Sequence, residues 1–239
     1  TVPAGGVFAS LKSASGTVSF TTGYTYTANG QVRSMTLPQV ATAAGSNVVL
    51  GKETVTTYFD SASQPRWMGS GFGWGTYVAE SRLSAFGQPV AMDLGNSYGA
   101  VVSYEWDEVT GRLMGVGLQR EQIAGSDLAL RYSYDDAVNV TSIKYRPTNP
   151  ALAGAALQDN QCFGYDGLRR LTTAWTAKDD AYCSLSASSI TPGKVGGVAP
   201  YWTQYTYDAL GNRTSLTQHT TDAVTGTDTT VKTTYTYGT

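Results

Sequence analysis

One short phrase recurs along this chain and constrains its fold more than any other feature. Two aromatic residues are separated by one residue, an aspartate follows, and a glycine comes three residues after the aspartate, as in Tyr205-Thr-Tyr207-Asp208-Ala-Leu-Gly211. Because side chains alternate along a strand, the two rings lie on one face. The aspartate can accept hydrogen bonds from backbone N–H groups ahead of it, and glycine tolerates the positive φ of a tight turn. The phrase therefore predicts a β-hairpin.

The phrase returns with variations along most of the chain. Clear copies contain Tyr165-Asp166 and Tyr134-Asp135, and a copy with one extra turn residue runs from Asp107 to Gly111. Between the copies, residues alternate as in strands and show no helical period. We expect an all-β chain of consecutive antiparallel β-hairpins, organised as a single segment over residues 1–239. Its turns are expected near 27–31, 60–65, 84–88, 107–112, 135–140, 166–170 and 208–212, with a truncated repeat from 235.

The turn residues fall into two groups. In five-residue turns, glycine is expected at the fourth position, but Val138 and Arg169 stand there in two copies. A β-branched residue is strongly disfavoured at positive φ, so we expect Asn139 to take that conformation in place of Val138. The sequence offers no such relief for Arg169. The residues predicted to build the turns are Asp107, Gly111, Asp135, Asp166, Asp208 and Gly211.

Composition excludes several classes of function. The net charge is −2 and only 14% of residues are charged, which argues against a nucleic-acid partner. No apolar run approaches the roughly 18 residues of a membrane span, so we expect no membrane insertion by this segment. The glycine-rich run 69–75 lacks the Gly-Lys-Ser/Thr ending of a phosphate loop. We therefore expect no cofactor.

The repeated phrase resembles the YD repeats of Rhs proteins, of the C-component shells of insecticidal toxin complexes and of teneurins. The resemblance extends from about Tyr24 onward, and Tyr205–Leu216 is its most specific part. Residues 161–176, with Cys183 and residues 196–202, resemble large secreted Rhs-type proteins of actinobacteria.

The resemblance implies a curved strip that is a fragment of a hollow β-shell around a toxin cargo. The implied partners are the remainder of a parent shell and an enclosed toxin domain, and the implied location is extracellular or at the cell surface. Such shells end in a self-cleaving core with an Asp-Pro motif. This sequence contains no Asp-Pro, so we expect neither an autoprotease nor a toxin domain in it.

The secreted family also bears on the two cysteines. In an extracellular protein, Cys162 and Cys183 suggest a disulfide that closes a loop of about 20 residues. Two free thiols are the alternative. A zinc site is not expected. A structural zinc site needs four cysteine or histidine ligands, and the two cysteines have only the single histidine, His219, to add to them.

Catalytic arrangements find little support. A Ser–His–Asp triad would need His219, which lies in a polar run and is expected to face solvent. Glu105 and Asp107 share one strand face and could form a carboxylate pair. However, Asp107 holds the turn position that aspartate occupies in the other repeats, which indicates a structural role. We predict that the chain is not an enzyme; a β-helix polysaccharide-cleaving enzyme would require parallel strands.

Three further features of the sequence bear on function and assembly. Phe72, Trp74 and Tyr77 could stack on sugar rings, which makes a carbohydrate-binding or adhesion module the alternative function. Residues 149–157 begin with Asn-Pro and form either a short helix or an irregular insertion. Finally, unpaired sheet edges favour self-association of the isolated chain.

Overall fold

The computed structural model describes residues 20–41, 48–71, 75–96, 98–152, 157–222, 225 and 227–238. It divides into two compact units, residues 1–102 and 103–239. The described part of the first unit contains β1 (Gly23–Tyr26), β2 (Val32–Leu37), β3 (Val40–Ala41), β4 (Val48–Leu50), β5 (Glu53–Phe59), β6 (Pro65–Ser70), β7 (Thr76–Leu83) and β8 (Pro89–Leu94). The strand β9 (Ala100–Trp106) spans the boundary between the units.

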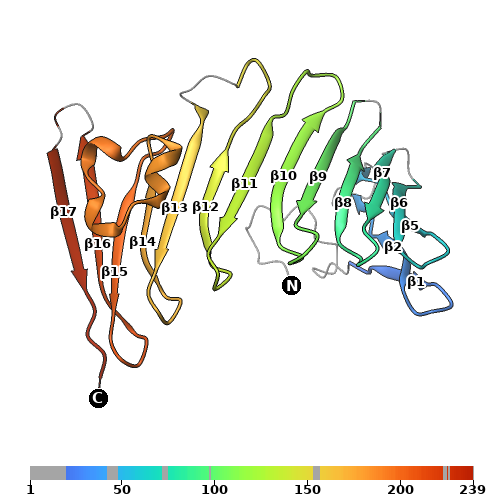
Figure 1. The fold of residues 1–239 in the computed structure, drawn as a ribbon. Coiled ribbons are helices and arrows are strands. Elements are labelled where there is room, and N and C mark those ends of the chain that lie inside the picture. Colours follow the sequence, from blue (N-terminus) through green and yellow to red (C-terminus); the bar gives the residue numbers. More distant parts are fainter. Residues whose placement is uncertain are drawn as a thin grey trace. The chain divides into compact units, whose positions relative to one another are not determined.

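The second unit continues with strands on the same plan (Figure 1). They are β10 (Leu113–Arg120), β11 (Leu128–Tyr134), β12 (Val140–Tyr145), β13 (Asp159–Tyr165), β14 (Leu171–Thr176), β15 (Trp202–Tyr207), β16 (Arg213–Asp222) and β17 (Thr227–Thr234). Three short 3-10 helices lie between β14 and β15: η3 (Asp180–Ser184), η4 (Ala187–Ser189) and η5 (Pro192–Lys194).

The strands follow one another as a meander. In the main sheet the order is β1-β2-β5-β6-β7-β8-β9-β10-β11-β12-β13-β14-β15-β16-β17, and β3 and β4 form a separate pair. Neighbouring strands pair antiparallel, for example β13 with β14 and β15 with β16. The prediction of an all-β chain of consecutive antiparallel hairpins is confirmed.

An irregularity of pairing recurs where each hairpin meets its turn. In β15 the register with β16 shifts between Thr206 and Tyr207, immediately before the turn. The same shift precedes Tyr134 in β11 and Tyr165 in β13. Such a bulge adds local twist and lets a five-residue loop close a hairpin. It therefore places the second aromatic of each phrase at a defined point beside the turn.

The largest departure from the hairpin pattern is a segment that the sequence analysis did not predict. Residues 177–200, called the strap below, leave β14, form η3, η4 and η5, and cross one face of β14–β16 before β15 begins (Figure 1). The strap contributes Ala177, Ile190 and Val195 to a buried cluster with Cys162, Trp175 and Trp202 of the sheet. A true hydrophobic core thus forms where a second layer covers the sheet.

The region around residues 149–157 is described only in part. Leu152 N–H donates to the Asn149 carbonyl and Ala151 N–H to the Asn149 side chain, which makes a turn. Residues 153–156 lie outside the described residues, so the choice between a helix and an irregular insertion stays open.

Candidate functional site

The turns that join the strands of each hairpin share one hydrogen-bond pattern. At 208–212, Asp208 N–H donates to the Asn212 carbonyl and Gly211 N–H donates to the Asp208 carbonyl. The Asp208 carboxylate then accepts from Leu210 N–H at 2.9 Å and Asn212 N–H at 2.8 Å, and its second oxygen accepts from the Asn212 amide. The aspartate thus fills the turn with its own side chain.

The other predicted turn aspartates lie in equivalent places. Asp166 accepts from Leu168 N–H and Arg170 N–H, each at 2.9 Å. Asp135 accepts from Asn139 N–H at 2.8 Å, and Asp107 accepts from Thr110 N–H at 2.7 Å. Each carboxylate is directed into its own turn and not toward a shared site.

These hydrogen bonds shift the acidity of the turn carboxyls. The Asn212 side chain lowers the pKa of Asp208, and the Asn139 side chain does the same for Asp135. The Arg170 N–H lowers the pKa of Asp166, and the Thr110 hydroxyl lowers that of Asp107. In every case the bonds favour the ionised form, so the turns are built around carboxylates.

The backbone of one of the two turns without glycine differs from the sequence expectation. Val138 itself adopts positive φ, at 71°, and the burden does not move to Asn139; that prediction was wrong. Arg169, for which the sequence offered no relief, has φ of 62°. The physical reason lies in the turn network: Asp135 holds Asn139 by both its backbone and its side chain, which fixes the residue before it. Hydrogen bonds within the turn thus outweigh a backbone cost of about 1–3 kcal/mol.

Neighbouring hairpins of the second unit are joined by tyrosine hydroxyls. In these hairpins the second aromatic donates its hydroxyl to the carbonyl of the first residue after the preceding turn. Among the described residues, the pairs are Tyr134 to Leu113 at 2.7 Å, Tyr165 to Val140 at 2.9 Å, Tyr207 to Leu171 at 2.8 Å and Tyr237 to Arg213 at 2.9 Å. We call these contacts hydroxyl bridges. They fasten each hairpin to the one before it at the turn margin.

Arginines reinforce the same junctions. Arg170 donates to Asp166 in its own turn at 2.7 Å and to the Asp208 carbonyl in the next turn at 2.9 Å. Its guanidinium also lies 4.8 Å from the centre of the Tyr207 ring. Arg112 stands in the same relation to Tyr134 at 5.7 Å. A cation over an aromatic face adds attraction to the hydrogen-bonded junction.

The strap is fastened to the sheet by the two cysteines. Cys162 of β13 and Cys183 of η3 form a disulfide with a Cα–Cα distance of 5.1 Å. Cys162 is 1% exposed and packs with Trp175 and Trp202. The disulfide therefore ties the strap to the only buried hydrophobic cluster found among the described residues.

His219 lies in a different environment from the one predicted. Its side chain is 8% exposed and does not face solvent, because the ring stacks on Trp202 with centres 3.5 Å apart. Nδ1 lies 2.7 Å from an Asp228 oxygen and Nε2 lies 3.2 Å from the Gln204 side-chain oxygen. These contacts connect β15, β16 and β17. The polar sequence around His219 gave no sign of this burial, because its neighbours Trp202 and Asp228 come from other strands.

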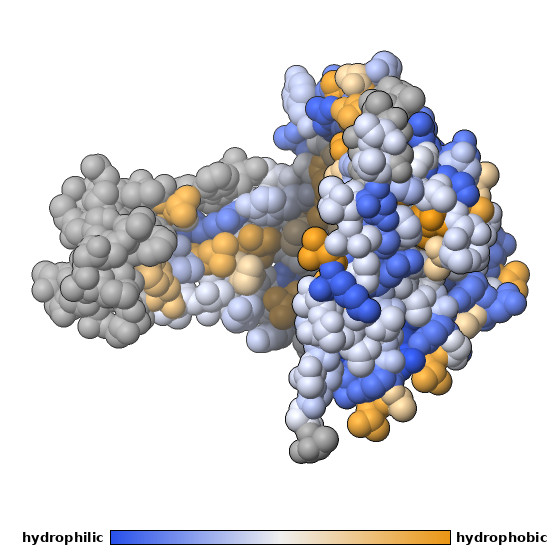
Figure 2. All heavy atoms as spheres, turned by 90° about the vertical axis from the view of Figure 1, so that its left-hand side faces the viewer, coloured by the Kyte–Doolittle hydropathy of each residue, from blue (hydrophilic) through white to orange (hydrophobic). Residues whose placement is uncertain are grey.

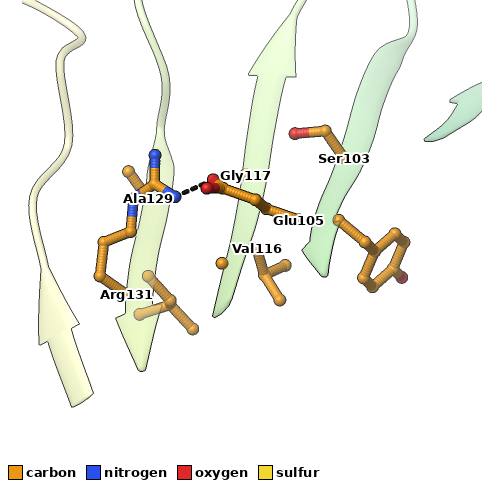
Figure 3. A pocket seen from close by; sticks show the side chains of 9 residues that line it. Ser103, Glu105, Val116, Gly117, Ala129 and Arg131 are labelled. Atoms are coloured by element: carbon orange, nitrogen blue, oxygen red, sulfur yellow. Dashed lines mark hydrogen bonds and ion pairs between the residues drawn. The ribbon is translucent and has the colours of Figure 1, made fainter. Parts of the chain in front are cut away.

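The possible carboxylate pair does not form. Glu105 forms an ion pair with Arg131, whereas Asp107 turns back into its own loop. The Glu105–Arg131 ion pair crosses a hollow of about 280 Å³ that is lined by residues of β9–β11, including Gly115 and Gly117 (Figure 3). Within the described residues, no cluster of histidine, cysteine and acidic side chains could hold a metal ion. The hollow offers one salt bridge and no second acid facing it.

The residues proposed for sugar stacking are only partly visible. Phe72 and Trp74 lie outside the described residues. Tyr77 of β7 donates its hydroxyl to Glu53 of β5, and this bond raises the pKa of the tyrosine. No helix in the described part of the chain has the length and apolar character to cross a membrane.

Comparison with known proteins identifies the fold. No family model and no curated protein matches the chain. Among solved structures, the crystal structure of TcdB2-TccC3-Cdc42 matches 90% of the chain with a TM-score of 0.65 and 21% identity. The chain shares its fold with part of a Tc toxin.

Two related structures agree. TcdB2-TccC3-TEV matches 88% of the chain with a TM-score of 0.62 and 22% identity. The Photorhabdus luminescens Tc holotoxin pore with the TccC3 D651A mutation also matches 88%, with a TM-score of 0.61 and 21% identity. In each case the chain spans only about a tenth of the matched chain, covering 10%, 10% and 9% of the three.

Proposed function

We propose that this chain is a wall segment of a large Rhs-type protein and forms part of a β-shell that encloses a toxin. The observation that carries the proposal is the series of hairpins joined one to the next by hydroxyl bridges, in a fold shared with part of TcdB2-TccC3. The YD phrases in the sequence support the same assignment. The mechanism is confinement. Backbone pairing and hydroxyl bridges hold adjacent hairpins together, so that neither a protease nor the cargo can pass between them.

The proposed role follows from the chemistry of the junctions. Turn carboxylates are satisfied locally, and the tyrosine hydroxyls cap carbonyls of the preceding hairpin. Because these polar groups are paired, few backbone N–H or C=O groups between hairpins lack a hydrogen-bond partner. A continuous wall needs this property more than it needs a reactive group.

We further propose that the segment works outside the cell or at its surface. The Cys162–Cys183 disulfide supports this placement, because such bonds persist in oxidising compartments. Alkylation of secreted protein before reduction tests it: both cysteines should resist alkylation. Two freely alkylated thiols in the mature protein would contradict an oxidising location.

The main test uses the parent protein with its cargo. Deleting residues 103–234 should expose the cargo to added protease, whereas the intact parent should protect it. A milder variant avoids a general loss of folding: Tyr134, Tyr165, Tyr207 and Tyr237 are all changed to phenylalanine. Its cargo should be digested faster than that of the intact protein.

The matched control changes Tyr104 and Tyr132 to phenylalanine. These tyrosines occupy the first aromatic position in β9 and β11 and take no part in the hydroxyl bridges. The control should protect the cargo as the intact protein does. Cargo that stays protected after the deletion would show that this segment does not confine it.

A further inference from the structure

The turns of the second unit share one margin of the sheet. In an antiparallel meander, every second connection lies on the same side, so the turns 107–112, 135–139, 166–170 and 208–212 follow each other along it (Figure 1). Neighbouring strands lie about 4.8 Å apart, which places successive turns roughly 10 Å apart. We call this margin the turn rim.

Apolar side chains stand at the outermost points of the turn rim. Val109 is 93% exposed, Val138 52%, Leu168 70% and Leu210 89%. Separate hydrophobic residues protrude along the lower right margin in Figure 2. The turns do not need these side chains, since their hydrogen bonds use the aspartate and the backbone. Single exposed apolar residues are ordinary on a protein surface. Here one stands on each of four successive turns, so the four form a line along one margin of the sheet.

Charges are distributed unevenly along the same rim. The first two turns carry the exposed acids Glu108 and Asp136, and the third carries the exposed base Arg169. The fourth turn has no exposed charge at its tip, which consists of Ala209, Leu210 and Gly211. The rim is therefore acidic toward its first half and basic at the third turn.

We propose that the turn rim binds the turn rim of a second copy of this chain around a two-fold axis between the second and third turns. In this register, turn 135–139 faces turn 166–170 of the other copy, so Asp136 meets Arg169 twice. Turn 107–112 faces turn 208–212, so Val109 meets Leu210, and Val138 meets Leu168. Every apolar tip then has an apolar partner.

Charges and apolar tips together select this register over its neighbours. Moving the axis onto turn 135–139 would set Glu108 against Arg169, but it would also set Asp136 against Asp136 of the other copy and leave Leu210 without an apolar partner. Moving it onto turn 166–170 would set Arg169 against Arg169 and leave Val109 without one. Like charges placed opposite each other and an unpaired apolar tip disfavour both alternatives. An anionic membrane is a poorer partner, because the exposed tips carry two acids and one base. The inference does not rest on the proposed function.

Sedimentation equilibrium of the chain over a range of concentrations tests the proposal. The average mass should rise from monomer toward dimer. Leu168→Asp combined with Leu210→Asp should weaken dimerisation about tenfold or more, because charged tips replace two apolar contacts in each copy. The control Val231→Asp changes a side chain that is 58% exposed on β17, away from the rim, and should leave dimerisation unchanged.

Exchanging charges tests the register itself. Asp136→Arg alone and Arg169→Asp alone should each weaken dimerisation, and the double variant should restore it to within about twofold of the original. A mass that stays monomeric at every concentration overturns the proposal. So does a Val231→Asp effect as large as that of the leucine pair, a double charge variant no better than the singles, or binding to phosphatidylcholine vesicles by a monomeric chain.

Discussion

The hairpins of residues 20–102 and those of residues 103–238 use the same turn chemistry but differ in how they are joined. Asp60 accepts from Ala62 N–H and Gln64 N–H at 2.9 Å, as Asp208 does in its own turn. At the second aromatic position of the first unit, however, Phe59 and Leu83 carry no hydroxyl, and Tyr26 belongs to the first described hairpin. The described hydroxyl bridges all lie in the second unit.

Burial differs in the same direction. In the first unit the described buried residues are Gly69, Val78 and Ser81, whereas the second contains the cluster around Trp175 and the strap. A complete turn therefore produces a hairpin but does not by itself fasten it to the next hairpin. Hydroxyl bridges and a covering layer supply that connection. We therefore expect the second unit to be the more stable.

Removing the disulfide that holds the strap should change the stability of the second unit more than any other substitution considered below. Changing Cys162 and Cys183 to serine should lower the free energy of unfolding of the second unit by about 3 kcal/mol, since the disulfide restricts the unfolded chain. Urea unfolding with and without a reductant measures this loss. The double variant should be insensitive to reductant. An intact protein with the same midpoint in both conditions would contradict the prediction.

Acid should destabilise the second unit more than the first. The lowered pKa values of Asp107, Asp135, Asp166 and Asp208 mean that the folded state favours their ionised forms. Their contribution is present above the unfolded pKa of about 3.9 and is lost as the pH falls through the folded values. In the first unit, two of the turns open on Thr27 and Ser84, which do not titrate in this range.

Hydrogen exchange with peptide mass spectrometry resolves this difference between the units. Between pH 5 and pH 3, protection should fall more steeply in the four aspartate turns of the second unit than around Thr27 and Ser84. Parallel loss of protection in all of these turns would show that the carboxylates do not govern the response to acid.

Removing one hydroxyl bridge should have a smaller effect. Tyr207→Phe should reduce the free energy of unfolding by about 1 kcal/mol, because the Leu171 carbonyl loses its hydrogen-bond donor. Tyr134→Phe should behave alike through Leu113. The matched control is Tyr132→Phe in the same strand, whose hydroxyl forms no bridge. Equal losses in Tyr132→Phe and Tyr134→Phe, measured by urea unfolding, would assign the effect to the ring environment and not to the bridge.

Adding a hydroxyl bridge to the first unit should have a smaller effect still. In Phe59→Tyr, the new hydroxyl should reach the carbonyl of Val32, the first residue after the preceding turn. Stability of the first unit should rise by about 0.5 kcal/mol. Hydrogen exchange at β2 and β5 would detect the gain. No change in exchange there would show that these two hairpins do not meet as those of the second unit do.

The sequence was sufficient for the hairpins because their information is local. An aspartate followed by a glycine three residues later specifies a turn within a few residues, so strand order and antiparallel pairing followed directly. The same local reasoning was wrong for Val138, because the bonds between Asp135 and Asn139 override the preference of one residue. It was also wrong for His219, whose partners come from β15 and β17.

The hydroxyl bridges and the strap were missed for the same physical reason: both depend on contacts between hairpins. Two signals were present in the sequence. Tyrosine, and not phenylalanine, fills the second aromatic position at 134, 165, 207 and 237. The interval of 42 residues from Tyr165 to Tyr207 exceeds the others and contains the strap.

Each hydroxyl bridge reaches no further than the hairpin immediately before it, and this locality has an evolutionary consequence. Duplication or loss of one complete repeat leaves every remaining joint with the same donor and acceptor. At the opposite margin, the strap shows that a connection can accept a long insertion. Evolution can therefore change the number of hairpins, or lengthen a connection at the margin opposite the turn rim, without altering the hydroxyl bridges.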